Sequence, residues 1–219
     1  MFRDREEAGR LLAEHLKSRL VAGKGEAVVL GIPRGGVIVA AAVATALGAP
    51  LDVIVPRKLG APGNPELAVG ALALAGGEDI ALVDDRTVRA LGISDAYLKE
   101  EIERQRREIV RRETAYREGR PPEPVEGLVA VLVDDGVATG LTARAAARAV
   151  RRRSPREVVV GVPVAPPETV RDFAAEGVRL EALETPWPFG AVGRFYLDFR
   201  QVEDEEVIAV LRAHRAGQA

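Results

Sequence analysis

Cysteine is absent from this chain of 219 residues, and only two histidines, His15 and His214, are present. The lack of thiols excludes disulfide bonds, thiolate catalysis and zinc–thiolate centres. Two isolated histidines, without acidic residues at a metal-ligand spacing, leave little for a histidine-based metal centre or catalytic triad. We expect His15, in an amphipathic segment, and His214, near the C-terminus, to be structural or solvated.

A surplus of one charge is also lacking, because 31 Lys and Arg residues accompany 33 Asp and Glu residues, for a formal net charge of -2. Such a chain has no overall field that would draw it to nucleic acid or to a membrane, so any anion has to be bound locally. The longest apolar run, 37–47, is too short to span a bilayer, and the first ten residues contain no apolar signal core. We therefore predict a cytoplasmic protein with no nucleic-acid or membrane partner.

Asparagine occurs once and glutamine is scarce, whereas Arg, Glu, Ala and Pro are abundant. This composition is typical of a thermophile or of a source with GC-rich DNA. It indicates a habitat and says nothing about function.

What the chain does have is a regular alternation of helices and apolar strands. After a helix at 4–20, the pattern predicts strands at 27–33, 51–56, 128–135, 157–165 and 178–186, with helices at 35–48, 141–153 and 166–177 between them, and a last helix beginning around 203. Apolar strands connected through helices form parallel sheets that are covered on both faces. The predicted fold is therefore α/β, a Rossmann-like parallel β-sheet flanked by helices.

The stretch between the two halves breaks this alternation. Residues 57–66 are rich in turn formers and predict a loop, and residues 67–85 predict two strands joined at a Gly-Gly turn. Residues 94–118 predict a long helix with Glu and Arg four positions apart. We expect a single domain over 1–219, with an inserted charged helical segment at about 85–124 and a C-terminal aromatic tail at about 185–219.

The sequence VLVDDGVATGLT, residues 131–142, places two adjacent carboxylates, Asp134 and Asp135, at the end of an apolar strand. An unpaired buried charge is costly, and ligands of such folds bind at the carboxyl ends of strands. The following turn offers consecutive backbone N–H groups at a helix start, a phosphate cradle made of Ala138, Thr139, Gly140, Leu141 and Thr142. Carboxylates accept hydrogen bonds from vicinal hydroxyls. A ribose 5-phosphate satisfies both halves of the motif.

This stretch resembles the signature of the type I phosphoribosyltransferases, in which a hydrophobic strand, two acidic residues and a Thr-Gly-x-Thr loop bind the ribose 5-phosphate end of phosphoribosyl pyrophosphate (PRPP). The resemblance covers roughly residues 27–164. It implies that Asp134 and Asp135 are catalytic residues that hold the ribose hydroxyls, and that residues 138–142 bind the 5-phosphate.

The first strand-to-helix turn, GIPRGGV, supplies a second half of the expected site. Gly35 and Gly36 let the chain bend until amide groups face an anion, and Arg34 can bind the anion bidentately. In the resembled family this loop binds pyrophosphate and often holds a non-proline cis peptide. We expect that peptide between Arg34 and Gly35.

Lys58, with Arg57 beside it, follows the next predicted strand and precedes a loop rich in glycine and proline. The resemblance places a pyrophosphate-binding lysine and a mobile catalytic flap here, so Lys58 is the expected phosphate contact. Solvated basic residues at a strand end are also common. Glu66 could be a catalytic or base-contacting carboxylate, and capping is at least as good an explanation.

Two other features leave their roles open. Arginines at 104–117 alternate with glutamates, which favours a solvated helix or an oligomer contact over a nucleic-acid surface; a homodimer through this helix is one hypothesis. Aromatic residues gather in the tail, where they could stack on a planar base, form a small hood over the cleft or pack in the core: Trp187, Phe189, Phe195 and Tyr196.

The resemblance implies a phosphoribosyltransferase of nucleotide metabolism that transfers ribose 5-phosphate from PRPP to a nitrogenous acceptor. Magnesium is expected mainly on PRPP oxygens, without a closed protein metal site. Hypoxanthine-guanine phosphoribosyltransferases typically carry an aspartate where this chain has Ala138, so the acceptor stays unassigned: a nucleobase, ammonia or another group.

The same fold also serves non-catalytic regulators that sense PRPP, and assembly subunits. The balanced charge disfavours a nucleic-acid regulator. A PRPP-synthesising pyrophosphokinase is disfavoured because no separate ATP-binding motif is present.

Overall fold

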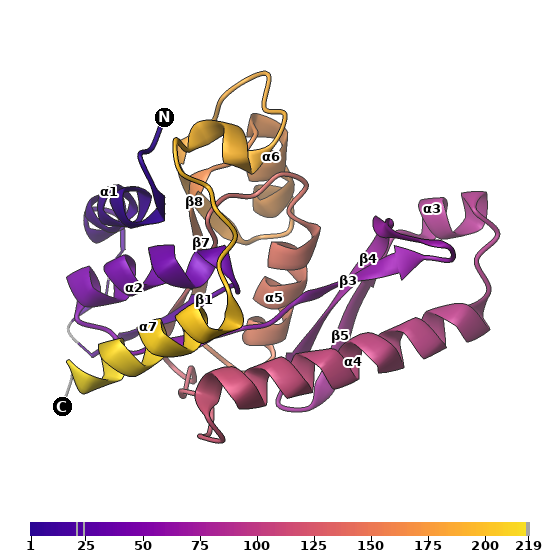
Figure 1. The fold of residues 1–219 in the computed structure, drawn as a ribbon, viewed down its shortest axis with the longest axis horizontal. Coiled ribbons are helices and arrows are strands. Elements are labelled where there is room, and N and C mark those ends of the chain that lie inside the picture. The colour runs from indigo at the N-terminus through magenta and orange to yellow at the C-terminus, as the bar shows by residue number, and fades with distance from the viewer. Residues whose placement is uncertain (21, 24, 218–219) are drawn as a thin grey trace.

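The main sheet is parallel and five-stranded, in a computed structural model that describes residues 1–20, 22–23 and 25–217 (Figure 1). Its strands, in spatial order, are β2 (Leu51–Val53), β1 (Ala27–Gly31), β6 (Val129–Val133), β7 (Glu157–Val164) and β8 (Arg179–Glu184). All neighbouring pairs run parallel, and Gly31 lies opposite Val133 at the carboxyl end of the central pair. The predicted fold class is confirmed.

Two layers of helices cover this sheet. They are α1 (Arg5–Lys17), α2 (Gly35–Leu47) and α7 (Asp204–Ala216) on one face and α5 (Leu141–Arg151) and α6 (Pro167–Ala175) on the other. Alternate residues of β1 point to opposite faces, so Val29 packs in the cluster with Leu12 of α1. Leu30 packs in the cluster with Ala146 of α5 and Phe173 of α6.

Both histidines contact residues of other elements. His15 Nε2 of α1 lies 3.1 Å from Glu181 Oε2 of β8. His214 Nε2 of α7 lies 3.0 Å from the Ala49 carbonyl oxygen. Within the described residues, none of the helices combines the length and the hydrophobicity that a membrane crossing requires.

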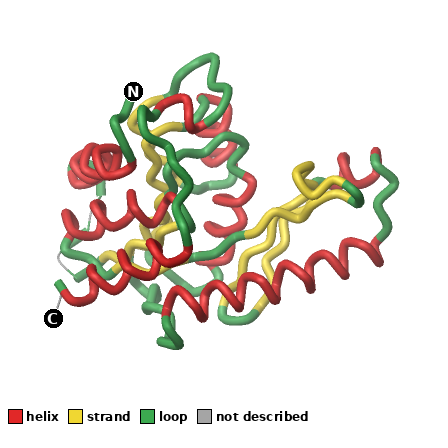
Figure 2. The backbone as a smooth tube through the Cα atoms, in the orientation of Figure 1, coloured by secondary structure: helices red, strands yellow, loops and turns green. Residues whose placement is uncertain are grey.

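The segment between β2 and β6 extends away from the main sheet (Figure 2). It contains a second, antiparallel sheet and two helices: β3 (Arg57–Ala61), β4 (Asn64–Ala75), β5 (Glu78–Val83), α3 (Asp85–Ala90) and α4 (Asp95–Arg117). The hairpin of β4 and β5, with its turn at Gly76 and Gly77, is present as expected.

The loop expected at 57–66 is wrong, because most of these residues belong to β3 and to the start of β4. The pairing contains irregular steps around Gly60. A Cβ at Gly60 would lie 2.8 Å from Pro65 Cα, so a glycine is required where the strands approach. Turn-forming residues here serve a tight, irregular hairpin instead of a loop.

A buried ion pair joins the end of α4 to the main sheet. Arg117 Nε donates to Asp52 Oδ1 of β2 at 2.9 Å, and Nη2 donates to the Val53 carbonyl oxygen at 2.7 Å. Asp52 Oδ2 also accepts from the Glu123 N–H at 3.0 Å. Arg117 and Asp52 are 8% and 5% exposed, and Arg117 Nη1 also donates to Glu113 Oε2 at 3.0 Å. The Asp52 carboxylate therefore depends on Arg117 for compensation of its charge.

We expect Arg117→Met to lower the free energy of unfolding by about 3–5 kcal/mol, because the substitution leaves the Asp52 carboxylate buried without its cation. Arg111→Met is the matched control: Arg111 lies on the same helix, pairs with Glu108 and is 58% exposed, so its loss should cost less than about 1 kcal/mol. Urea unfolding of both variants measures the difference. Equal losses would contradict the anchoring role of Arg117.

Candidate functional site

The acid pair, Asp134 and Asp135, and the loop 138–142 that is expected to form a phosphate cradle lie at the carboxyl edge of β6, where the chain turns into α5. Asp134 and Asp135 directly follow the strand, and the helix begins at Leu141. Gly140 is the N-cap residue, with a φ of 73°, and a Cβ there would lie 2.8 Å from the Phe173 ring. Glycine is therefore required at this position for two reasons, its positive φ and the close packing of α6.

Two hydrogen bonds fix the cradle loop between the end of β6 and the start of α5. Thr169 Oγ1 of α6 donates to the Ala138 carbonyl oxygen at 2.5 Å, and the Val137 N–H donates to the Val164 carbonyl oxygen at 2.9 Å. Ala138 and Thr139 are exposed. The loop is thus held from behind while its outer surface remains accessible to a ligand.

The β1–α2 turn lies directly against the acid pair. The Ile32 N–H donates to the Val133 carbonyl oxygen at 2.8 Å, which continues the pairing of β1 with β6 beyond the strands. A Cβ at Gly36 would lie 2.8 Å from Asp134 Cα, and a Cβ at Gly35 would overlap the Asp135 carboxylate. The two motifs, about a hundred positions apart in sequence, form one surface because neither glycine has a side chain.

The non-proline cis peptide of this turn joins Pro33 to Arg34. The position expected from the sequence, between Arg34 and Gly35, is wrong by one bond. Helix α2 begins at Gly35, and Arg34 is its N-cap residue with right-handed helical dihedrals. The Arg34–Gly35 peptide is therefore already part of the helix start, and the turn lies before it.

The two carboxylates of the acid pair have different partners. Asp134 Oδ1 accepts from the Asp135 N–H at 2.9 Å. Burial, and next the negative charge of Asp135, raise the pKa of the Asp134 carboxyl well above its ordinary value. Asp135 Oδ2 accepts from Arg5 Nε at 2.7 Å in an ion pair whose side chains are 15% and 10% exposed.

Arg5, the first residue of α1, is a site residue that the sequence did not reveal. Its Nη1 donates to the Arg200 carbonyl oxygen at 2.8 Å, and its guanidinium carbon lies 4.0 Å from the centre of the Phe199 ring. No local motif distinguishes Arg5 from the other arginines of the chain. Only the tertiary packing of α1 and the C-terminal segment beside β6 brings it to Asp135.

The aromatic tail contacts the backbone of the acid pair through Tyr196. Tyr196 Oη donates to the Asp135 carbonyl oxygen at 2.5 Å, and its ring packs 5.4 Å from Phe2 and 4.9 Å from Phe199. Burial raises the pKa of the Tyr196 hydroxyl. Of the roles left open for the tail, core packing applies to Tyr196. It does not apply to Trp187, whose side chain is 76% exposed.

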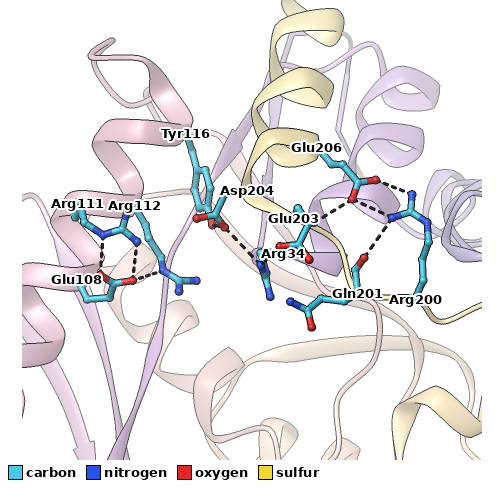
Figure 3. A network of polar contacts seen from close by, with 10 residues as sticks. All are labelled: Arg34, Glu108, Arg111, Arg112, Tyr116, Arg200, Gln201, Glu203, Asp204 and Glu206. Atoms are coloured by element: carbon cyan, nitrogen blue, oxygen red, sulfur yellow. Dashed lines mark hydrogen bonds and ion pairs between the residues drawn. The ribbon is translucent and has the colours of Figure 1, made fainter.

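Arg34 is held by the start of α7 in a polar network (Figure 3). Its Nη1 lies 3.0 Å from Glu203 Oε2 and 3.9 Å from Asp204 Oδ1. Tyr116 Oη of α4 donates to the same Asp204 Oδ1 at 2.7 Å. Burial, and next the hydrogen bond to Asp204, raise the pKa of Tyr116 to about 12. The guanidinium therefore joins the β1–α2 turn to the start of α7, and Asp204 in turn joins α7 to Tyr116 of α4.

Lys58 of β3 lies near the cradle loop. It lines a cavity of about 340 Å³ together with Thr142, which we call the β3–α4 cleft. A second cavity, of about 900 Å³, is also lined by Lys58, Glu66, Thr139 and Thr142. The structure thus brings Lys58 and Glu66 to the two cradle threonines.

This chain is similar to proteins of one family over most of its length. Residues 5–199 match the phosphoribosyl transferase domain family. A Mycobacterium tuberculosis H37Rv protein named "Putative phosphoribosyl transferase" is 46% identical over 217 residues, which are 98% of this chain and 47% of that protein. The chain therefore spans about half the length of the curated relatives it matches. The crystal structure of TT1426 from Thermus thermophilus is 48% identical, with a TM-score of 0.79 over 96% of this chain and 97% of that chain.

The raised pKa of Asp134 predicts how Asp134→Asn changes stability with pH. The folded protein binds the Asp134 proton more tightly than the unfolded chain does. Protonation of Asp134 therefore stabilises the folded state; this contribution is complete below the ordinary pKa of 3.8 and is lost as pH rises through the pKa of the folded state. Asn keeps the neutral form at every pH. The variant should therefore melt higher than the wild type at about pH 8, and this advantage should vanish near pH 4.

Thermal unfolding between these pH values measures the effect, with Asp172→Asn as a control because Asp172 is an exposed residue of α6. A melting difference for Asp134→Asn that stays constant over this range would contradict the electrostatic explanation.

Proposed function

The chain belongs to the phosphoribosyl transferase domain family, and from this premise we propose that it transfers ribose 5-phosphate from PRPP to a nitrogenous acceptor and releases pyrophosphate. One observation carries the proposal: Gly35 and Gly36 pack against Asp134 and Asp135 without room for a Cβ. An acid pair that suits ribose hydroxyls and a loop that suits pyrophosphate then share one surface.

In this proposal the 5-phosphate binds the amide groups and hydroxyls of residues 138–142 at the start of α5. Asp134 and Asp135 accept hydrogen bonds from the ribose hydroxyls. The amides of Gly35 and Gly36, with Arg34 and Lys58, bind pyrophosphate.

The reaction breaks the bond between the anomeric carbon and a pyrophosphate oxygen, and pyrophosphate departs with the bonding electron pair. A new bond forms between the anomeric carbon and an acceptor nitrogen, which gives up a proton. The protein contributes by holding the partners in place and by stabilising the charge that develops on pyrophosphate. A carboxylate close to the anomeric carbon also stabilises positive charge on the ribose.

Magnesium fits this donor set as an ion that enters with PRPP. The ion retains several waters and needs only one or two protein carboxylates, and Asp134 and Asp135 are the carboxylates that could hold it. When bound, it would neutralise charge on the pyrophosphate. Among the described residues, no group of three or more histidine, aspartate and glutamate side chains is arranged to hold a metal ion.

The acceptor is the least constrained part of the proposal. Ala138 has a methyl group that cannot take a proton from an incoming base, so any proton acceptor has to come from another residue or from water. Glu66, which lines both cavities near Lys58, is a carboxylate available for that role. The curated relatives are about twice as long as this chain. The activity of such a full-length protein is therefore part of the same proposal.

Calorimetry with ribose 5-phosphate and with magnesium PRPP tests the binding step, and pyrophosphate release over a panel of bases and amines tests turnover. We expect Asp135→Asn to weaken binding of both ligands by about 10–100-fold, because hydrogen bonds to a charged acceptor contribute about 1.5–3 kcal/mol. Asp172→Asn, on α6, should bind as the wild type does.

Absence of ribose 5-phosphate and PRPP binding to the wild type would refute the proposal. PRPP binding without turnover for any acceptor would favour a PRPP-sensing or assembly protein on the same fold.

Arg5 should matter for binding through its contact with Asp135. We expect Arg5→Gln to weaken ribose 5-phosphate binding about tenfold, because the Asp135 carboxylate loses a charge-assisted hydrogen bond that orients it. Arg10→Gln removes an exposed arginine from the same helix and should leave binding unchanged. If both variants bind alike, Arg5 does not orient Asp135 for the ligand.

A further inference from the structure

Arg34, which the proposed function assigns to pyrophosphate, already has an anionic partner in the structure. Its Nη1 lies 3.0 Å from Glu203 Oε2 and 3.9 Å from Asp204 Oδ1, both at the start of α7 (Figure 3). The side chains of Arg34 and Glu203 are 28% and 56% exposed. Water and dissolved anions therefore reach this ion pair, and an exposed pair of this kind is weak enough to exchange.

The guanidinium of Arg34 uses only one of its nitrogens for the contact with Glu203. Within the described ranges, Nη1 donates to Glu203, and Nε and Nη2 have no hydrogen-bond partner. A phosphate group presents several oxygens, so it can accept two parallel hydrogen bonds from the planar edge of a guanidinium. The pyrophosphate of PRPP is therefore chemically able to displace the Glu203 carboxylate from Arg34.

Glu203 is held beside Arg34 by contacts of its own. Its N–H donates to Glu206 Oε1 at 3.0 Å, and Glu206 forms an ion pair with Arg200, in which Nη2 lies 2.6 Å from Oε2. Arg200 in turn supplies the carbonyl oxygen that accepts from Arg5. Because the backbone of Glu203 is fixed in this way, its carboxylate remains within reach of Arg34 after an anion has taken its place.

We propose that Glu203 competes with pyrophosphate for Arg34, so that the Arg34–Glu203 ion pair forms when the β1–α2 turn is empty and opens when pyrophosphate binds. The proposal rests on the proposed function, in which Arg34 binds pyrophosphate. The state with the ion pair intact withholds this guanidinium from the ligand, so its population lowers the measured affinity. Re-formation of the pair would also assist departure of the product pyrophosphate, a step that limits the rate of many enzymes.

Glu203→Gln tests this competition, because glutamine has a similar size, retains an oxygen that accepts from Arg34 and lacks the charge. Magnesium pyrophosphate is titrated by calorimetry into protein saturated with ribose 5-phosphate, so that the phosphate cradle is filled. We expect Glu203→Gln to raise the affinity for pyrophosphate about threefold to fivefold, because an exposed competing charge is removed. The affinity for ribose 5-phosphate should not change.

Glu205→Gln is the matched control for the loss of one negative charge. Glu205 lies in the first turn of the same helix, is exposed and forms no ion pair within the part of the chain that the structure describes. Its substitution should leave the affinity for pyrophosphate as in the wild type. An equal gain in both variants would indicate a general effect of charge and would overturn the competition for Arg34.

A double-substitution cycle tests whether Arg34 is the group for which the two anions compete. Arg34→Gln should weaken pyrophosphate binding, because the guanidinium is lost. In the Arg34→Gln background, Glu203→Gln should bring no further gain, because the group that Glu203 occupies is already gone. A gain that persists in this background would contradict the proposal.

The outcomes also separate this proposal from the proposed function. Unchanged affinity for pyrophosphate in Glu203→Gln would overturn the competition, and weaker binding would overturn it in favour of a residue that positions Arg34. A wild type that binds ribose 5-phosphate and no pyrophosphate would overturn it as well. Ribose 5-phosphate binding measured alone does not involve Glu203 and is the separate test of the proposed function.

Discussion

The close approach of the β1–α2 turn to the end of β6 is the constraint on which the rest of the site depends. Pairing of β1 with β6 brings Gly31 level with Val133, and the turn then continues across the acid pair. A side chain at Gly36 would meet backbone atoms of Val133 and Asp134, which cannot move without separating the strands. The distance between the β1–α2 turn and the carboxylates of Asp134 and Asp135 is therefore set by the sheet itself.

The two carboxylates at this junction require a compensating positive charge, which comes from a segment that is distant in the sequence. Asp134 and Asp135 lie side by side in a largely enclosed place, where two unpaired negative charges would be costly. Arg5 supplies the compensating charge from the first turn of α1, and the C-terminal segment holds Arg5 through the Arg200 carbonyl group and the Phe199 ring. The start of α1 and the segment 199–200 thus both contact the acid pair or its partner Arg5, although the recognisable motifs lie in the middle of the chain.

The sequence was sufficient for those features that depend on local pattern. Strand and helix alternation predicted the main sheet, and the Thr-Gly-Leu-Thr motif predicted a helix start, which the structure has at Leu141. The sequence was insufficient where tertiary contacts decide. Residues 57–61 look like a loop because glycine and lysine are poor strand formers, yet pairing with β4 makes them a strand. Arg5 carries no local signal, since its partner lies 130 positions away.

Helix α4 shows why a highly charged segment need not be only a solvated surface. Its C-terminal end is attached to the main sheet through Arg117 and Asp52. Nearer its start, Glu101 accepts from the Gly60 N–H, and Tyr97 Oη donates to the Gly60 carbonyl oxygen at 2.9 Å. Helix α4 therefore binds both the backbone N–H and the backbone carbonyl group of Gly60 in β3. At 1.5 Å per residue, this helix of 23 residues spans about 35 Å. Because Lys58 lies on β3 and Asp52 on the main sheet, α4 connects the antiparallel sheet to the main sheet. Packing of β4 and β5 on α5 is the second connection, so both contacts set the position of Lys58 relative to the acid pair.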